Sequence, residues 1–263
     1  MRRGLVRSEL TKILSTRLWW GLLAGVVIYT VIQAAASAAF AGVDGGPGAP
    51  TSPGLDTADA LRGVYAGSAF AGAFIFALVI GVTGMTAEYR YETATPTFLA
   101  TPRRVRVVVA KSLAHLVVGL GYGLVAVVCA FTAGGAVVLI RGHDLGLGSD
   151  ALWRAVLLAV LAVAVWTLVG IGIGTLIRNQ VAALLVAVGV TFLVEPLVSI
   201  GLYAADLDAV GKFLPSTASS AMTSPPTAYG ELLPWWAGAL VLGGYALVFA
   251  ALGVWLSVRR DIS

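Results

Sequence analysis

Long apolar runs with almost no charge, separated by short polar segments, make up most of the chain. A helix needs about 20 apolar residues to cross roughly 30 Å of hydrocarbon. The runs are continuous and lack the alternation of a transmembrane β-strand. We therefore predict six transmembrane helices, at residues 19–41, 63–85, 112–140, 152–176, 181–203 and 235–258.

Residues 1–18 form a separate amphipathic element before the first apolar run. Its apolar side chains gather on one helical face and its basic side chains occupy the rest. The apolar set is Leu5, Val6, Leu10, Ile13 and Leu14, and the basic set is Arg2, Arg3, Arg7, Lys12 and Arg17. This predicts a helix on the membrane surface. The alternative is a signal peptide cleaved after "ASA" at 36–38, but the apolar run before that site is too long for one.

The composition agrees with an integral membrane protein. The 263 residues are 59% hydrophobic and 11% charged, with a mean hydropathy of +0.92, whereas soluble domains carry about 25% charged residues. A single cysteine, Cys129, excludes an intrachain disulfide. The net charge of +4 is typical of basic cytoplasmic loops, so we expect membrane lipids as partners and no nucleic acid.

The distribution of Lys and Arg predicts the orientation. With the N-terminus inside, 13 of the 17 basic residues fall in inner segments, and most acidic residues fall outside. The positive-inside rule then places both termini in the cytoplasm. The predicted fold class is all-α and integral to the membrane, with an N-terminal amphipathic elbow helix and six transmembrane helices. In the outer segment 204–234, apolar residues and four prolines predict short re-entrant helices.

Several kinds of chemistry are missing from the sequence. Gly211-Lys212 is followed by Phe213, so the phosphate-loop motif is absent. The two histidines, His115 and His143, lack metal-ligand spacing. We find no buried nucleophile–base pair. The chain is therefore not expected to be an enzyme or to hold a metal or cofactor of its own.

Glu195 and Pro196 interrupt the fifth apolar run. Glu195 lies about 21 Å along that helix, at 1.5 Å per residue. A carboxylate at such depth costs about 2.5 kcal/mol or more unless it has a partner, and Pro196 is expected to kink the helix. Either Glu195 lines a substrate pathway or it is a structural carboxylate bonded to a neighbouring helix. Thr191, Glu195 and Pro196 are our candidates for the pathway.

The second apolar run carries a face of small residues with aromatic residues beside it. Alanines recur at Ala66, Ala69, Ala73 and Ala77, and the aromatic residues are Phe70, Phe74 and Phe76. Spaced small residues allow close helix packing. The face either packs within the chain or meets a second copy across a substrate route. Phe70 and Phe74 are added to the candidate pathway.

The segment 86–111, "TAEYRYETATPTFLATPRRVRVVVAK", concentrates charge between two apolar runs. Thr95-Pro96 and Thr101-Pro102 each fit a helix start, with Thr as N-cap and Pro in the first turn. They predict a short helix near 95–101 that carries Phe98 and Leu99. Charged residues surround it: Glu88, Arg90, Glu92, Arg103, Arg104 and Arg106. The segment is either a docking element for a cytosolic partner or a loop bound to lipid headgroups.

Three stretches resemble the membrane subunits of ABC-2 type transporters, especially those of bacterial two-gene systems. They are "SELTKILSTRLWW", "TAEYRYETATPTFLATPRRVRVVVAK" and "FLPSTASSAM". The second is similar to the family's loop T-[GA]-E-Y-R-x-G-T-x-x-x-T-x-L-x-x-P-x-R. It departs from that pattern at Glu92, where the family usually has Gly.

The resemblance implies that residues 1–263 form a single ABC-2 transmembrane domain in a bacterial plasma membrane. It implies a second membrane subunit, the same or homologous, and two copies of an ATPase subunit that bind ATP and magnesium. The second and fifth spans would line the dimer interface and the route. The cargo expected for such an exporter is amphipathic, drug-like or lipid-like.

The resemblance also makes 95–101 a coupling helix that receives the motion of the ATPase. The candidate coupling residues are Glu88, Arg90, Thr95, Pro96, Phe98, Leu99, Pro102, Arg103, Arg104 and Arg178. Two other classes of protein stay open. One is an ion-coupled secondary transporter that uses Glu195, and the other is an integral membrane protein without transport, as an enzyme or a scaffold.

Overall fold

A computed structural model describes residues 3–43, 53–91, 104–177, 179–224 and 232–259, and every regular element among them is helical. The helices up to residue 140 are α1 (Arg3–Leu14), α2 (Leu18–Phe40), α3 (Ala58–Arg62), α4 (Ser68–Arg90) and α6 (Arg104–Ile140). Those after it are α7 (Asp150–Leu176), α8 (Gln180–Gly189), α9 (Glu195–Ala204), α10 (Asp208–Gly211), α11 (Pro215–Thr223) and α12 (Trp235–Arg259). Two π-helical turns, η1 (Gly63–Gly67) and η2 (Val190–Val194), join α3 to α4 and α8 to α9.

Five helical stretches in the described residues are long and apolar enough to cross a membrane. They are Leu18–Phe40, Ala58–Arg90, Val105–Ile140, Asp150–Leu176 and Gln180–Ala204. Each coincides with one of the first five predicted spans. In α12 the described apolar stretch, Trp235–Phe249, is shorter. The chain is therefore an all-α multi-pass membrane protein, and the sixth span stays a prediction.

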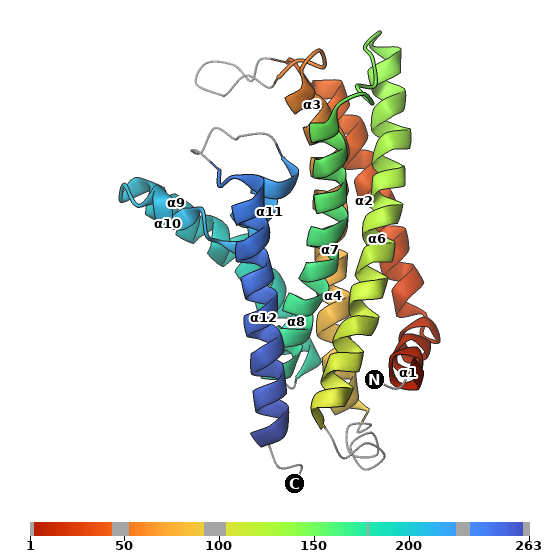
Figure 1. Cartoon of the computed structure of the whole chain (residues 1–263), viewed down its shortest axis with the longest axis vertical. Coiled ribbons are helices and arrows are strands. Elements are labelled where there is room, and N and C mark those ends of the chain that lie inside the picture. The colour runs from red at the N-terminus through yellow and green to blue at the C-terminus, as the bar shows by residue number, and fades with distance from the viewer. Residues whose placement is uncertain (1–2, 44–52, 92–103, 178, 225–231, 260–263) are drawn as a thin grey trace.

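The helices run side by side, with α1 and the last turn of α12 at the same end of the bundle (Figure 1). The helices α2, α4, α6 and α7 form its thickest part. The helix α8–η2–α9 instead crosses obliquely, and α9 and α10 project away from α7 and α12. The membrane side that each end faces stays a prediction.

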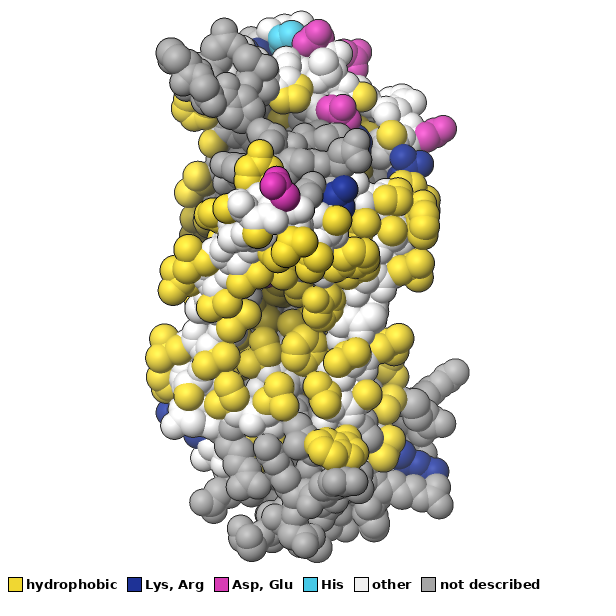
Figure 2. Space-filling view, turned by 90° about the vertical axis from the view of Figure 1, so that its left-hand side faces the viewer, with side chains coloured by type: hydrophobic (Ala, Val, Ile, Leu, Met, Phe, Trp, Pro, Cys, Tyr) yellow, Lys and Arg dark blue, Asp and Glu magenta, His cyan; other side chains and the backbone are white. Residues whose placement is uncertain are grey.

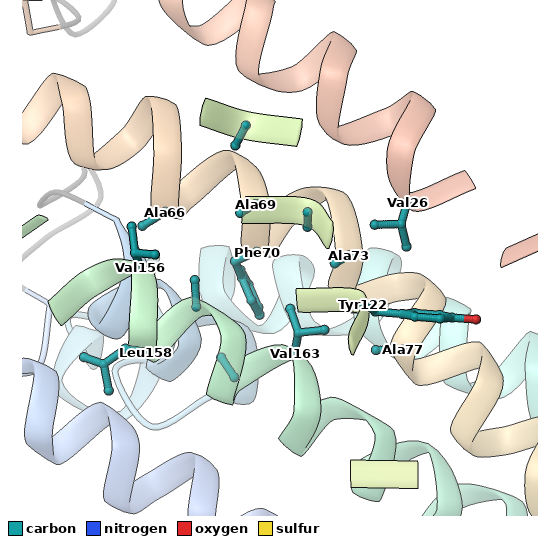
Figure 3. Packing of buried hydrophobic residues seen from close by; sticks show 14 of the residues in the cluster. Val26, Ala66, Ala69, Phe70, Ala73, Ala77, Tyr122, Val156, Leu158 and Val163 are labelled. Atoms are coloured by element: carbon teal, nitrogen blue, oxygen red, sulfur yellow. The ribbon is translucent and has the colours of Figure 1, made fainter. Parts of the chain in front are cut away.

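Close packing of α4 on α7 forms the centre of the bundle. Figure 3 shows the small residues of α4 facing Val156 and Val163 of α7, with side chains of α2 and α6 nearby. Gly81 and Gly170 continue this contact, since a Cβ on either would collide with backbone of the other helix. Small residues let the two backbones approach, as expected for helices in a membrane.

The alanine face that runs along η1 and α4 is buried inside the chain. Ala66, Ala69, Ala73 and Ala77 are all 0–1% exposed against other helices of the same chain. Of the two interpretations that the sequence left open, packing within the chain is therefore the correct one. The physical reason is that α7 carries matching small residues, which the pattern of α4 alone does not reveal.

The fifth span accommodates its proline through a π-helical turn. Residues Val190–Val194 form that turn and α9 begins at Glu195, so Pro196 lies in the first turn of α9. Proline lacks the backbone N–H that an internal helical position would use, and a π-turn changes the local bonding register. The predicted kink thus takes the form of a register change within a continuous helical stretch.

Hydrophobic side chains cover the middle of the face from which α9 and α10 project, and few charged groups interrupt them (Figure 2). On α8–η2–α9 the exposed apolar side chains include Val181, Leu185, Phe192, Leu193, Leu197 and Ile200. An exposed apolar surface of this extent marks contact with lipid or with another protein.

Candidate functional site

Four charged side chains from three helices form a closed ring of ion pairs beside α1. Lys111 Nζ of α6 lies 2.7 Å from Glu9 Oε2 of α1 and 2.9 Å from Glu88 Oε1 of α4. Lys12 Nζ lies 2.5 Å from Glu9 Oε1 and 3.5 Å from Glu88 Oε1. Each ammonium group thus bridges both carboxylates. We call these four residues the ion-pair ring.

The ion-pair ring is mostly shielded from solvent. Glu9, Glu88 and Lys111 are 5%, 6% and 3% exposed, whereas Lys12 closes the ring from its outer side. Lys111 also donates to the carbonyl of Gly84 at 3.1 Å. Charges are costly to bury unless they are paired and hydrogen-bonded. The equal number of positive and negative groups makes this burial possible.

The carboxyl group of Glu9 shows the balance between burial and charge. Burial by itself raises the pKa of Glu9. The nearby ammonium groups of Lys111 and Lys12 more than offset that effect, so the pKa lies below its usual value of 4.5. Glu9 is therefore ionised at neutral pH, and at acid pH near its usual pKa it binds fewer protons than it does in an unfolded chain.

His115 and Gly84 pack next to the ion-pair ring. The Nδ1 atom of His115 lies 2.9 Å from the carbonyl oxygen of Lys111. Because a carbonyl can only accept, Nδ1 carries the hydrogen in this contact. A side chain at residue 84 would collide with the imidazole. Glycine at this position thus allows α4 and α6 to approach each other beside the ring.

A cavity of about 480 Å³ opens beside the ion-pair ring and extends to Trp19, Ile80 and Gln180. On its α8 side, Arg90 Nη1 donates to Gln180 Oε1 at 3.1 Å. The N-terminal helix, the end of α4, the start of α6 and the start of α8 therefore meet around one polar site. This is the densest set of charged contacts in the described part of the chain.

The structure corrects the surroundings expected for Glu88. The sequence placed its carboxylate among polar contacts at the edge of the coupling helix, but it is buried and paired with Lys111 and Lys12. The reason is that α1 folds against α6 and supplies Lys12 and Glu9, which the local sequence cannot indicate. Arg90 remains exposed in part and contacts Gln180.

The other predicted coupling residues are mostly not described. Residues outside the described ranges are Thr95, Pro96, Phe98, Leu99, Pro102, Arg103 and Arg178, together with the helix predicted at 95–101. Arg104 is the first residue of α6. The two described helices that flank residues 92–103 each contribute one member of the ion-pair ring, Glu88 of α4 and Lys111 of α6.

Among the predicted pathway residues, Phe70 and Phe74 belong to an aromatic cluster between α4, α7 and η2. Their ring centroids lie 5.1 Å apart, and Phe74 lies 5.2 Å from Trp166 and 5.8 Å from Phe192. Thr191 is buried nearby and donates to the carbonyl of Ala187. The structure thus brings Phe74 close to η2, the turn that precedes Glu195.

Glu195 bonds to a neighbouring helix. Its Oε1 accepts from the backbone N–H of Ser216 at 2.6 Å, in the first turn of α11. The same helix also bonds to Trp166, whose Nε1 donates to Ser219 Oγ at 3.0 Å. A carboxylate at a helix N-terminus satisfies a free N–H and complements the helix dipole. Pro196, the next residue, is exposed.

Sequence reasoning missed the partners that complete the ion-pair ring. Glu9 is an acidic residue in an otherwise basic helix, and Lys111 stands at the edge of an apolar run. Each of the two residues stands out in the sequence because its charge differs from its neighbours. Their pairing depends on how α1 packs on α6, so the sequence offered a signal for each residue but not for the pair.

The helices and the ring define the class: an α-helical membrane protein with several spans and a buried charged junction at one end. No protein-family model matches the chain, and no curated protein is significantly similar to it in sequence.

Proposed function

We propose that the chain is the membrane subunit of an ATP-driven exporter of the ABC-2 type in a bacterial plasma membrane. A separate ATPase subunit, present in two copies, binds ATP and magnesium. A second membrane subunit, the same or homologous, completes the route. The motif in residues 86–111 supports this proposal, as do the apolar helices.

The observation that carries the proposal is the ion-pair ring, which joins the two helices that flank the 92–103 segment. Glu88 precedes this segment and pairs with Lys12 of α1. Lys111 follows it and pairs with Glu9 of α1 and with Glu88. Separating these helices would leave buried charges unpaired, at a cost of several kcal/mol. A movement of residues 92–103 that the ATPase causes would therefore move α1, α4 and α6 together. Such a rigid-body movement of helices can open a gate.

The proposed route runs along the aromatic cluster and the oblique helix α8–η2–α9. Phe74 contacts Phe192 of η2, and the outer apolar face of this helix is exposed along most of its length. We assign that face to the second membrane subunit. An apolar route of this kind suits an amphipathic, drug-like or lipid-like cargo better than a highly charged one.

The experiment is capture of the ATPase by the tagged chain, followed by substrate-stimulated ATP hydrolysis of the complex. Phe98→Asp is expected to lose both, because it places a charge at the apolar tip of the coupling helix. The matched control is Phe213→Asp, at an exposed phenylalanine between α10 and α11. Unchanged capture and hydrolysis in Phe98→Asp would contradict the proposal.

A further inference from the structure

A second cavity, of about 350 Å³, lies at the end of the bundle opposite the ion-pair ring. Its walls come from the end of α3, the start of α7, the end of α11 and the start of α12. The continuous helical stretch Ala58–Arg90 carries Arg62 of this cavity near its start and Glu88 of the ring near its end. The volume falls within the range of small-molecule sites.

Arg62 enters the wall of this cavity already oriented by two neighbours. Its Nη1 lies 3.1 Å from Asp59 Oδ1, and its Nη2 donates to the carbonyl of Ser224 at 3.3 Å. Its Nε is buried and has no hydrogen-bond partner in the described part of the chain. Buried donors are almost always bonded in folded proteins, so the missing acceptor for this N–H is unusual.

Arg154 supplies a second guanidinium group to the same cavity. It lies 5.2 Å from the centre of the Trp235 ring, in the geometry of a cation–π contact. Among the described residues, no carboxylate lies within ion-pair distance of it. Since Asp59 balances Arg62, Arg154 leaves the wall with an excess positive charge.

Apolar side chains form much of the remaining wall, including Ala155, Met222 and Leu233. Guanidinium groups match the geometry of carboxylate and phosphate oxygens and bind them with two hydrogen bonds. The combination of two arginines with an apolar wall thus fits a molecule that has an anionic head and an apolar body.

We propose that this cavity binds the oxyanion head of an amphipathic molecule, a phosphate or carboxylate attached to an apolar chain. Arg154 contributes the uncompensated charge, Arg62 adds a second guanidinium group to the wall, and Trp235 contacts Arg154 through a cation–π interaction. The molecule comes either from the anionic lipids of the bilayer or from soluble amphiphiles. The site does not depend on the exporter role, because binding requires neither an ATPase nor transport.

The test measures binding of decyl phosphate to the full chain in nanodiscs of phosphatidylcholine. Saturable binding is expected, and Arg154→Gln should weaken it about tenfold, the effect of losing one charge-assisted hydrogen bond. Arg154→Lys keeps the charge but loses the geometry for two parallel hydrogen bonds. Its affinity for decyl phosphate should lie between that of the unmodified chain and that of Arg154→Gln. Because Arg154 is exposed and makes no ion pair with a described residue, these variants should fold.

Lys212→Gln is the matched control, since it removes the same charge from a residue outside the cavity wall. Its affinity for decyl phosphate should stay within about twofold of the unmodified chain, because most surface substitutions change little. Equal affinity in Arg154→Gln and the unmodified chain overturns the proposal. Absence of saturable binding overturns it too, as does equally tight binding of uncharged decanol.

A second arm identifies the source of the anion. The chain is released from nanodiscs that contain phosphatidylglycerol, and retained lipids are counted by native mass spectrometry. More phosphatidylglycerol on the unmodified chain than on Arg154→Gln assigns the site to membrane lipid. Equal retention, with decyl phosphate binding still dependent on Arg154, assigns it to a soluble amphiphile.

Discussion

Lys111 Nζ lies 2.7 Å from Glu9 Oε2, although the two residues are 102 positions apart in the sequence. The contact joins the N-terminal helix to the start of α6, and Glu88 brings the end of α4 to the same ammonium group. Each member depends on the others, since any one left alone would be a buried charge without a partner. This junction makes α1 part of the bundle and not only a helix on the membrane surface.

Replacing Lys111 by Met should strongly destabilise the protein. Lys111 is 3% exposed and pairs with Glu9 and Glu88. Its loss leaves two buried carboxylates with Lys12 alone, and we expect a loss of about 3–5 kcal/mol in the free energy of unfolding. Thermal unfolding in detergent measures it as a lower midpoint.

Lys212→Met serves as the control for Lys111→Met, because Lys212 forms no ion pair among the described residues. Lys212→Met should change the free energy of unfolding by no more than about 0.5 kcal/mol. The double variant Lys111→Met, Glu88→Gln should be less destabilised than the sum of its single changes, since it removes one of the unpaired charges. Strict additivity would argue against a shared network.

The stability of the protein should depend on the ionisation of Glu9 at acid pH. The folded pKa of Glu9 lies below 4.5, so the folded state binds fewer protons at this group than the unfolded state. The ionised Glu9 therefore contributes its full stabilisation of the folded state at a pH above 4.5. This stabilisation disappears as the pH falls from 4.5 toward the lower pKa of the folded state. The unmodified chain should lose thermal stability more steeply than Glu9→Gln as the pH falls from 6 to about 3. Parallel curves would show that Glu9 is not the responsible group.

Gly81→Ala should destabilise the contact between α4 and α7. A Cβ at Gly81 would collide with the carbonyl oxygen of Thr167 in the facing helix. Backbone atoms cannot move aside cheaply, so we expect a cost of about 1–3 kcal/mol. Gly121→Ala is the control, because nothing lies within 4 Å of a Cβ there. That change should be neutral or stabilise the helix, and equal effects in a thermal unfolding assay would contradict the predicted collision.

Glu195→Ala should loosen α11, whereas Glu195→Gln should largely preserve it. The Oε1 atom accepts from Ser216 N, and glutamine keeps such an acceptor while alanine does not. Loss of a capping bond costs about 1 kcal/mol. The measurement is maleimide labelling of Ala221→Cys, a buried residue of α11, in a Cys129→Ala background. Faster labelling with Glu195→Ala is expected, and equal effects of Gln and Ala would instead indicate that the charge matters.

The first five spans could be predicted from the sequence because the length of an apolar run is a local property. Each matches a helix that is long and apolar enough for the bilayer. Glu195 could be recognised as unusual for a similar reason, since a carboxylate in an apolar run needs a partner. Its partner in α11 could not be named from the sequence, because Ser216 contributes only a backbone N–H, which every residue except proline has.

The sequence alone therefore determined the class of protein, the approximate ends of the spans and the residues that needed an explanation. Only the tertiary structure decided that the alanine face of α4 packs against its own chain and that Glu88 is buried. It also decided that Glu9 and Lys111 meet. The length of an apolar run is a property of one segment and can be read from the sequence. The partner of a charge or of a small residue depends instead on which helices pack together.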